Sequence, residues 1–225
     1  MSISIIVPCF NEEKTVVKVI RNIKFHLDQK IDYEIVFVDD KSTDKTFDTV
    51  KNIFIDDKNI IIHQNNFNLG YGGAFKNGLK LSSKKNCVVI PGDDEADLES
   101  IFKNLNFMKD YDVISLYPIN SDRGILREIL SASYTKILNF FFKLNLKYYN
   151  GTAFYQTHLV KEIEIKSNGF FFNAEILIKL IYLKRKHKEL PVKLNLRKRG
   201  NSNALKFKTL LGVIKDFINL KKNLI

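Results

Sequence analysis

The sequence predicts an α/β fold in which a mostly parallel sheet is covered by helices on both faces. In the first half of the chain, short runs of β-branched and other apolar residues alternate with segments whose apolar residues recur at helical spacing. These runs are apolar almost throughout, which is typical of parallel strands that are buried on both faces. Five strands are expected there, at 3–8, 33–38, 60–63, 87–90 and 112–117.

Helices are predicted between and after these strands. The first follows Asn11 and carries its apolar stripe at Val16, Ile20, Ile23 and Leu27. Further helices are expected after N-cap residues at 42–44, around 74–81, near 98–108, and at 125–144, 173–185 and 204–220, with a strand at 190–196. The strict alternation of strands and helices stops after residue 120, so we expect the C-terminal part to be mainly helical.

The composition favours one large domain, or one domain with an appendage. Hydrophobic residues make up 45% of the 225 residues, which is enough for a core and argues against disorder. Cys9 and Cys87 fall in or beside predicted strands, so we expect buried thiols in a reducing compartment and neither a disulfide framework nor a zinc site. The N-terminus reads as a strand, and no run of about 18 apolar residues occurs. We therefore expect a cytoplasmic protein without a membrane-spanning helix.

Positive charge is concentrated at the end of the chain. Residues 184–225 hold 13 Lys and Arg residues against two acidic ones, so this segment accounts for the whole net charge of +11. The predicted final helix has an apolar stripe that lysines flank. The stripe consists of Phe207, Leu210, Leu211, Ile214, Phe217 and Ile218. Such a helix lies in a membrane interface or packs on the core, and the charge favours the membrane. The stretch "TKILNFFFKLNL" is a second candidate for such a surface.

Polar residues follow four of the predicted strands directly. Their sequences are "PCFNEE", "DDKSTD", "NNFNLGYGGA" and "PGDDEAD". In an open parallel sheet the carboxyl ends of the strands meet at one edge, where ligands bind. One such loop alone is usually an ordinary connection with a helix cap, whereas four at one edge indicate a ligand site. The third loop has neither the GxGxxG nor the Walker pattern, so a dinucleotide enzyme or a P-loop ATPase is not indicated.

Carboxylates are dense at the end of the fourth strand. Asp93, Asp94, Glu95 and Asp97 lie within five residues, where they repel one another unless a cation is bound. The side chains of Asp93 and Glu95 are expected to alternate onto one side, which suits Mg²⁺ or Mn²⁺ held jointly with a diphosphate. Asp97 and Glu99 instead fit the acidic start of a helix.

The second and third loops contain further candidates for ligand contacts. Asp39 and Asp40 follow a strand directly, and such carboxylates accept hydrogen bonds from a base or ribose, or cap the next helix. The third loop and the helix after it have four glycines, which permit close approach of a ligand to the backbone. These are Gly70, Gly72, Gly73 and Gly78.

Four stretches of the sequence resemble, in order, successive motifs of glycosyltransferase family 2. They read "SIIVPCFNEEKTV", "EIVFVDDKSTDKT", "NFNLGYGGAFKNG" and "VVIPGDDEADLESI", and the match is collinear over roughly residues 2–101. Within the family, the chain resembles the dolichyl- or polyprenyl-phosphate mannosyltransferase-like enzymes. The resemblance implies a Rossmann-like GT-A domain over 1–200. This domain would have a nucleotide-sugar half at about 1–118 and an acceptor half at about 119–200, followed by a basic helix at 201–225.

The resemblance also implies roles for individual residues of the first half. Five residues would hold the nucleoside of a GDP- or UDP-sugar: Pro8, Asn11, Glu12, Asp40 and Gly70. Asp93 and Glu95 would hold Mg²⁺ or Mn²⁺ at the donor diphosphate. The usual Asp-x-Asp-x-Gln pattern reads Pro91-Gly92-Asp93-Asp94-Glu95 here, so its first Asp is missing. Either Asp94 compensates or fewer protein ligands hold the metal.

Basic and hydroxyl residues of the second half resemble the family segments that meet phosphate. The candidates are Arg123, Arg127 and Ser131 in "SDRGILREILS" and Arg197, Arg199 and Ser202 in "LRKRGNSNALK". Arg suits phosphate because its guanidinium binds two oxygens at once. An ordinary solvated surface position is the alternative for each. "GFFFNAEILIKLI" resembles a helix start that carries a Glu, which is Glu175 here.

The leading hypothesis is a metal-dependent, inverting glycosyltransferase that moves a sugar from a nucleotide sugar to a polyprenyl phosphate. It would act as a peripheral protein at the cytoplasmic face of the membrane. Catalytic roles fall to Asp93, Asp94 and Glu175. A sugar hydroxyl acceptor needs a general base, for which Asp94, Asp97 and Glu175 are the candidates, whereas a lipid phosphate needs none. The alternatives are a saccharide acceptor in lipopolysaccharide, capsule or glycan assembly, a nucleotidyltransferase, and a basic nucleic-acid-binding module. No nucleic-acid-binding motif is present, so no nucleic acid partner is expected.

Overall fold

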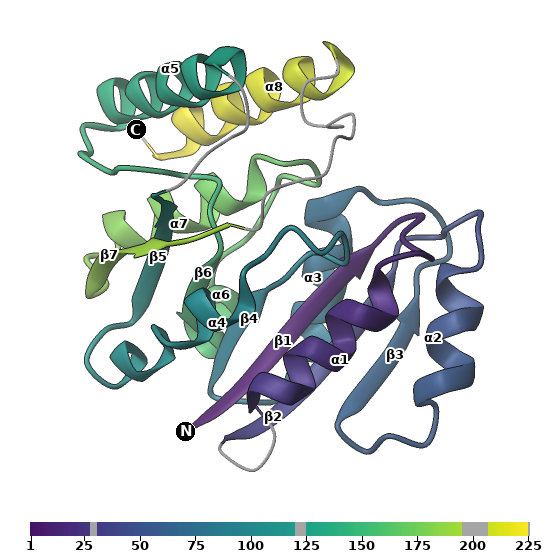
Figure 1. Cartoon of the computed structure of the whole chain (residues 1–225). Helices are drawn as coiled ribbons and strands as arrows, with labels where there is room; N and C mark the ends of the chain where they lie inside the picture. Colours follow the sequence, from purple (N-terminus) through teal and green to yellow (C-terminus); the bar gives the residue numbers. More distant parts are fainter. Residues whose placement is uncertain (28–30, 120–124, 195–206, 225) are drawn as a thin grey trace.

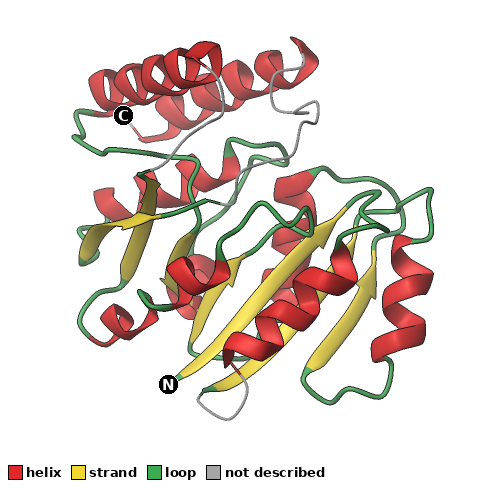
Figure 2. Ribbon diagram, in the orientation of Figure 1, coloured by secondary structure: helices red, strands yellow, loops and turns green. Residues whose placement is uncertain are grey.

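The computed structural model describes residues 1–27, 31–119, 125–194 and 207–224, which form a seven-stranded sheet covered by helices (Figure 1, Figure 2). The strand order is β3-β2-β1-β4-β6-β5-β7. The strands are β1 (Ser2–Cys9), β2 (Asp32–Asp39), β3 (Ile60–Gln64), β4 (Asn86–Val89), β5 (Val113–Pro118), β6 (Ala153–Gln156) and β7 (His187–Val192). All pairings are parallel except those of β6 with β4 and β5. The predicted mostly parallel sheet is confirmed.

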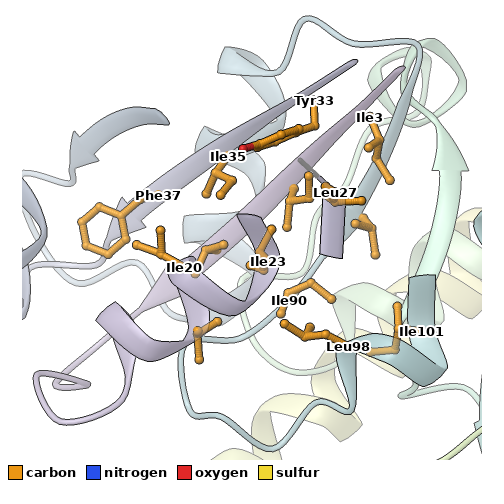
Figure 3. Packing of buried hydrophobic residues seen from close by; sticks show 14 of the residues in the cluster. Ile3, Ile20, Ile23, Leu27, Tyr33, Ile35, Phe37, Ile90, Leu98 and Ile101 are labelled. Carbon is orange, nitrogen blue, oxygen red and sulfur yellow. The ribbon is translucent and has the colours of Figure 1, made fainter. Parts of the chain in front are cut away.

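Side chains of the sheet alternate between two apolar layers. Ile3, Ile5 and Val7 of β1 face the layer that α1 (Val16–Leu27) covers, and Figure 3 shows part of this cluster. Ile6 faces the opposite layer. Other helical segments are α2 (Thr46–Phe54), α4 (Leu98–Phe102) and the 3₁₀ helix η1 (Leu105–Lys109) on the first layer, and α3 (Tyr71–Leu81), α5 (Ile125–Phe142), α6 (Thr157–Glu162), α7 (Phe172–Tyr182) and α8 (Phe207–Leu224) on the second. The apolar stripe predicted for α1 is buried.

The second half contains elements that the sequence did not predict. β6 lies between β4 and β5 in the sheet although it follows both in the chain, and α6 follows β6 directly. With four residues, β6 is too short to carry a readable pattern. The helix expected near 98–108 is divided into α4 and η1, and the strand expected at 190–196 instead runs from His187 to Val192.

α8 lies beside α5 (Figure 1) and has two different apolar faces. Phe217 packs edge-on against Phe141 and Phe142 of α5, with ring centroids 5.2 and 5.7 Å apart. Three other members of the predicted stripe are exposed: Leu211, Ile214 and Ile218. The helix therefore both packs on the core and presents apolar side chains outward. Within the described residues, no helix is long and apolar enough to cross a bilayer.

Candidate active site

The loops after β1, β2 and β3 meet at the carboxyl edge of the sheet. The N–H groups of Asp40 and Asn65 donate to the carbonyl oxygens of Cys9 and Asp39, both at 2.8 Å, so the strand ladder continues past the strand ends. Pro8 is buried within β1. Residues that are distant in the sequence are therefore neighbours at this edge, as expected for a parallel sheet.

The loop after β1 is fastened to the loop after β2. Asn11 has a left-handed φ of 59°, its N–H donates to Ser42 Oγ at 2.9 Å, and its Oδ1 accepts from the Thr43 N–H at 2.8 Å. The Glu12 N–H donates to Thr46 Oγ1 at 2.8 Å. These bonds fix the shape of the two loops. Contacts of Pro8, Asn11 and Glu12 with a nucleoside stay a prediction.

Asp40 is buried and accepts three hydrogen bonds from the chain itself. Its Oδ1 accepts from Asn65 Nδ2 at 2.7 Å and from the Leu69 N–H at 2.9 Å, and its Oδ2 accepts from the Gly70 N–H at 2.8 Å. Because both oxygens are used, the carboxylate holds the loop between β3 and α3 against the end of β2. The geometry gives Asp40 this supporting role, and a direct nucleoside contact stays a prediction.

Asp39 is fully buried, and its two carboxylate oxygens differ in their partners. Oδ2 accepts from the Ser42 N–H at 3.1 Å and from Gln64 Nε2 at 2.9 Å. Oδ1 has no hydrogen-bond partner among the described residues. A buried carboxylate oxygen without a partner is unfavourable, and an N–H group of a bound ligand would satisfy it. Of the adjacent residues Asp39 and Asp40, Asp39 is the one with a carboxylate oxygen that can accept a hydrogen bond from a ligand.

The glycine-rich start of α3 touches a loop from the second half of the chain. Gly70 has a φ of 80°, and a Cβ atom there would lie 2.7 Å from the carbonyl oxygen of Asn168. A Cβ on Gly72 would lie 2.9 Å from the carbonyl oxygen of Ser167, and the Gly72 N–H donates to the Asn168 carbonyl at 2.8 Å. These glycines admit the backbone of the chain itself. A contact between Gly70 and a nucleotide stays a prediction.

Glu175 is buried in the first turn of α7 and is fully engaged. Its Oε1 accepts from the Lys166 N–H at 3.0 Å and from Lys179 Nζ at 2.6 Å, and its Oε2 accepts from the Ser167 N–H at 2.8 Å. These bonds fix the loop that rests on α3. The geometry therefore gives Glu175 a positioning role, and its use as a general base stays a prediction.

The acidic turn after β4 lies beside β1 and α1. Asp93 Oδ1 accepts from the Glu95 N–H at 3.2 Å. Asp94 has a left-handed φ of 60° and forms an ion pair with Lys18 of α1. Thr15 Oγ1 donates to the carbonyl oxygen that precedes Asp93, at 2.7 Å. Asp93 and Glu95 are thus neighbours in one turn, while Asp94 is drawn toward α1.

The residues of this turn fit a metal ion that arrives with a phosphate ligand. Asp97 is occupied as the N-cap of α4, where its Oδ1 accepts from the Ser100 N–H at 2.9 Å. Across the described ranges, no group of three or more His, Cys, Asp or Glu side chains is placed to hold a metal ion. Asp93 and Glu95 nevertheless offer the donor set with which proteins commonly bind Mg²⁺, namely one or two carboxylates plus substrate phosphates.

Two groups that the sequence did not mark as site residues lie close to the acids. Burial raises the pKa of the Cys9 thiol well above its usual value, and the carboxylates of Glu12, Asp39 and Asp93 add to this rise. Burial also raises the pKa of the Tyr71 hydroxyl, with a further contribution from Asp93. Both groups therefore keep their protons at neutral pH. Tyr71 is the first residue of α3, and no pattern in the sequence distinguishes it from a packing residue.

The residues expected to meet the acceptor phosphate are mostly outside the description. Four of them lie outside the described residues: Arg123, Arg197, Arg199 and Ser202. The side chain of Arg127 is also outside this description, and Ser131 is half-buried on α5. Their phosphate contacts stay predictions.

Comparisons with known proteins concern the family and the fold of the chain. Residues 4–160 match the family model of glycosyl transferase family 2. A dolichyl-phosphate beta-glucosyltransferase of Dictyostelium discoideum is 31% identical over 181 residues, covering 75% of this chain and 52% of the relative. A poly(ribitol-phosphate) beta-glucosyltransferase of Bacillus spizizenii is 30% identical over 111 residues, covering 49% of this chain and 18% of the relative. The chain thus spans about half or less of the length of these relatives.

Solved structures share the fold. Glucosyl-3-phosphoglycerate synthase of Mycobacterium tuberculosis, in complex with Mn²⁺, UDP-glucose and phosphoglyceric acid, matches with a TM-score of 0.74 at 16% identity, covering 98% of this chain and 80% of that one. The same protein has been crystallised with Mg²⁺ and UDP. At this identity the likeness shows the fold, which is GT-A.

The family match also decides between classes of function. The composition left nucleotidyl transfer and nucleic-acid binding open, and the matched family replaces both with glycosyl transfer. The acidic turn, the Asp39–Asp40 pair and the start of α3 all fall within the matched residues. The chain belongs to glycosyl transferase family 2.

Proposed function

We propose that the protein transfers a sugar from a nucleoside diphosphate sugar to a polyprenyl phosphate, with inversion at the anomeric carbon and with a divalent metal ion at the donor. The observation that carries the lipid acceptor is a set of exposed apolar side chains on α5 and α8, two helices that also carry exposed lysines. The relative from Dictyostelium, a dolichyl-phosphate glucosyltransferase, supports the same acceptor class.

This surface, which we call the α5–α8 face, comprises eight exposed apolar side chains. They are Ile129, Leu130, Ile137, Phe140 and Phe141 of α5 and Leu211, Ile214 and Ile218 of α8. Phe140 is 79% exposed, and Lys221 Nζ lies 4.2 Å from the centre of the Phe141 ring. Exposed apolar patches of this kind mark interaction sites.

Exposed lysines on or next to the same two helices support an anionic membrane as the partner. Four are exposed on or next to α5 and α8: Lys136, Lys143, Lys215 and Lys222. Each lysine near an anionic bilayer contributes roughly 1 kcal/mol of attraction, in addition to the burial of apolar side chains between the headgroups. The protein would therefore sit peripherally on the cytoplasmic face of the membrane, where a polyprenyl phosphate is presented.

At the donor end, the carboxyl edge of the sheet supplies the contacts. Asp39 would accept a hydrogen bond from a base N–H, while Asp40 and Glu175 hold the surrounding loops in place. Asp93 and Glu95 would hold Mg²⁺ or Mn²⁺ at the diphosphate. When bound, this ion neutralises negative charge on the departing diphosphate. The UDP-glucose complex of the solved neighbour supports a UDP-sugar donor, with a GDP-sugar as the alternative.

An anionic acceptor agrees with the state of the candidate bases. Asp94 is paired with Lys18, and both oxygens of Glu175 accept hydrogen bonds from the chain. A lipid phosphate is already ionised and needs no proton removed before it attacks, so these carboxylates can remain engaged during transfer. A saccharide hydroxyl would need a free base.

A transfer assay with a panel of acceptors tests the proposal. The protein is incubated with UDP- or GDP-sugars, Mn²⁺ or Mg²⁺, and vesicles that contain dolichyl or undecaprenyl phosphate. The expected result is a lipid-linked sugar together with a free nucleoside diphosphate. Transfer only to a saccharide would refute the lipid acceptor and favour the alternative. The name of the Bacillus relative, a poly(ribitol-phosphate) glucosyltransferase, supports a polymer in place of a lipid phosphate as the acceptor.

Co-sedimentation with vesicles tests the α5–α8 face separately. The double variant Ile137→Ser/Phe140→Ser removes two exposed apolar side chains, so it should bind anionic vesicles more weakly than the wild type. Phe25→Ser is the matched control, because Phe25 is 80% exposed but lies on α1. Equal binding by the double variant and the control would show that another surface meets the membrane.

A further inference from the structure

A partly buried hydrogen bond ties α8 to the segment between α6 and α7. Ser167 Oγ donates to Asp216 Oδ2 at 2.5 Å, and Ser167 is 1% exposed. Asp216 is the one acidic residue in the sequence of α8, which contains four lysines. A carboxylate facing an anionic membrane would weaken binding, whereas this one is hydrogen-bonded to a buried serine.

The segment that contains Ser167 rests directly on α3. The Asn168 carbonyl accepts from the Gly72 N–H at 2.8 Å, and Lys76 Nζ donates to the Ile165 carbonyl at 3.1 Å. A Cβ on Gly72 would lie 2.9 Å from the Ser167 carbonyl oxygen, so the two backbones are in contact. A shift of this segment therefore moves the start of α3.

The start of α3 in turn shapes the donor side. The N–H groups of Leu69 and Gly70 donate to the Asp40 carboxylate at 2.9 and 2.8 Å. The Tyr71 hydroxyl lies within electrostatic range of Asp93. A continuous series of contacts thus leads from Asp216 on α8 to the acids at the carboxyl edge of the sheet.

We propose that Ser167 and Asp216 are positioning residues that couple the membrane contact of α8 to the donor site. The coupling rests on the proposed function, which places a bilayer at the α5–α8 face and a nucleotide at the carboxyl edge. A bilayer restrains α8 and, through Asp216 and Ser167, the start of α3. Less ordering then remains when the nucleotide binds, so its affinity rises.

Coupling of this kind is reciprocal. If vesicles lower the dissociation constant of a nucleotide by a given factor, the nucleotide must lower the dissociation constant for vesicles by the same factor. Couplings between two sites typically amount to about 5-fold or more. A purely structural hydrogen bond would change stability without linking the two affinities.

The experiment measures both affinities in the full chain. UDP and GDP are titrated with Mn²⁺, in the presence and absence of vesicles of phosphatidylglycerol and phosphatidylcholine, and vesicle binding is measured with and without nucleotide. For the wild type we expect a coupling factor of at least about 5 in both directions. Ser167→Ala should still bind nucleotide and vesicles, but its coupling factor should be near one. Ser167→Thr keeps the hydroxyl and should therefore show the coupling of the wild type. Ser133→Ala is the matched control at an exposed serine of α5 and should behave as the wild type.

A second variant protects the test against a folding defect in Ser167→Ala. Asp216 is half-buried, so Asp216→Ala removes the acceptor at a position that tolerates change. Because a negative charge is lost, this variant should bind anionic vesicles at least as tightly as the wild type and yet lose the coupling. Loss of both properties together would mean that Asp216 only stabilises α8, and this would overturn the proposal.

The possible failures are distinguishable. If the wild type binds nucleotide and vesicles but neither affects the other, the coupling is overturned and the proposed function stands. If Ser167→Ala keeps the coupling factor of the wild type, the link through Asp216 is wrong. If the wild type binds no vesicles, the membrane part of the proposed function fails together with the coupling.

Discussion

Replacing Asp39 by Asn tests whether the buried oxygen without a partner receives the base of the nucleotide. Asn has the same size, and its remaining oxygen can keep the bonds from Ser42 and Gln64. The amide nitrogen then occupies the position of Oδ1, where a ligand N–H would meet another N–H. A hydrogen bond to a charged acceptor contributes about 1.5–3 kcal/mol, so the dissociation constant for UDP should rise roughly 10- to 150-fold.

Asp40→Asn is the matched control. It makes the same chemical change in a carboxylate that accepts three hydrogen bonds from the protein itself, so it should affect stability. The new amide group faces the N–H groups that now donate to the carboxylate. The amide oxygen can keep two of the three bonds, so at least one is lost, which costs about 1.5–3 kcal/mol and in a chain of this size lowers the Tm by roughly 3–12 °C.

Calorimetric titration with UDP and GDP, together with thermal unfolding, separates the two roles. Asp39→Asn should keep the Tm of the wild type and lose nucleotide affinity, and Asp40→Asn should show a clear fall in Tm. The base contact at Asp39 is refuted if Asp39→Asn binds both nucleotides as the wild type does. It is equally refuted if the two variants exchange behaviours, because Asp40 would then make the contact.

Three further predictions concern Gly92, Glu175 and His187. A Cβ on Gly92 would lie 2.3 Å from Cys9 Sγ, so Gly92→Ala should lower stability and activity, and adding Cys9→Ala should restore both; no rescue would locate the defect elsewhere. Glu175→Gln should lower the Tm and nucleotide affinity together, whereas loss of kcat alone would indicate a general base. Burial lowers the pKa of His187 to about 4, below its usual value of 6.5, so the unfolded state binds the proton more readily. The resulting stability is present above pH 6.5 and is lost as the pH falls toward 4; His187→Gln should flatten this part of the profile in urea unfolding, and an unchanged slope would contradict the assignment.

The strands of the first half could be predicted because each is a continuous apolar run bounded by polar residues. β6 could not, because its position depends on partners far away in the chain. Val88 of β4 and Ile114 of β5 both pair with Phe154, and four residues carry no pattern that shows this. The two faces of α8 could not be predicted either. Phe217 and Ile214 belong to one apolar stripe in the sequence, but in the structure Phe217 packs against α5 and Ile214 is exposed.

The location of the site could be predicted from the polar strand ends, but the roles of its members could not. Asp39 and Asp40 are adjacent acids, and the loop that brings Leu69 and Gly70 to one of them leaves the other with a spare oxygen. The glycines suggested room for a ligand, whereas the approaching backbone comes from Asn168, about a hundred residues later. Such contacts arise from tertiary structure and leave no local signal.

We expect the acidic turn after β4 to bind a metal ion together with a nucleoside diphosphate. Calorimetric titration of the wild type and Asp93→Asn with UDP, with and without Mn²⁺, tests it most directly. We expect Mn²⁺ to strengthen UDP binding to the wild type and to have little effect on the variant, whose Tm should stay unchanged. Equal gains in affinity from Mn²⁺ in both proteins would contradict the claim.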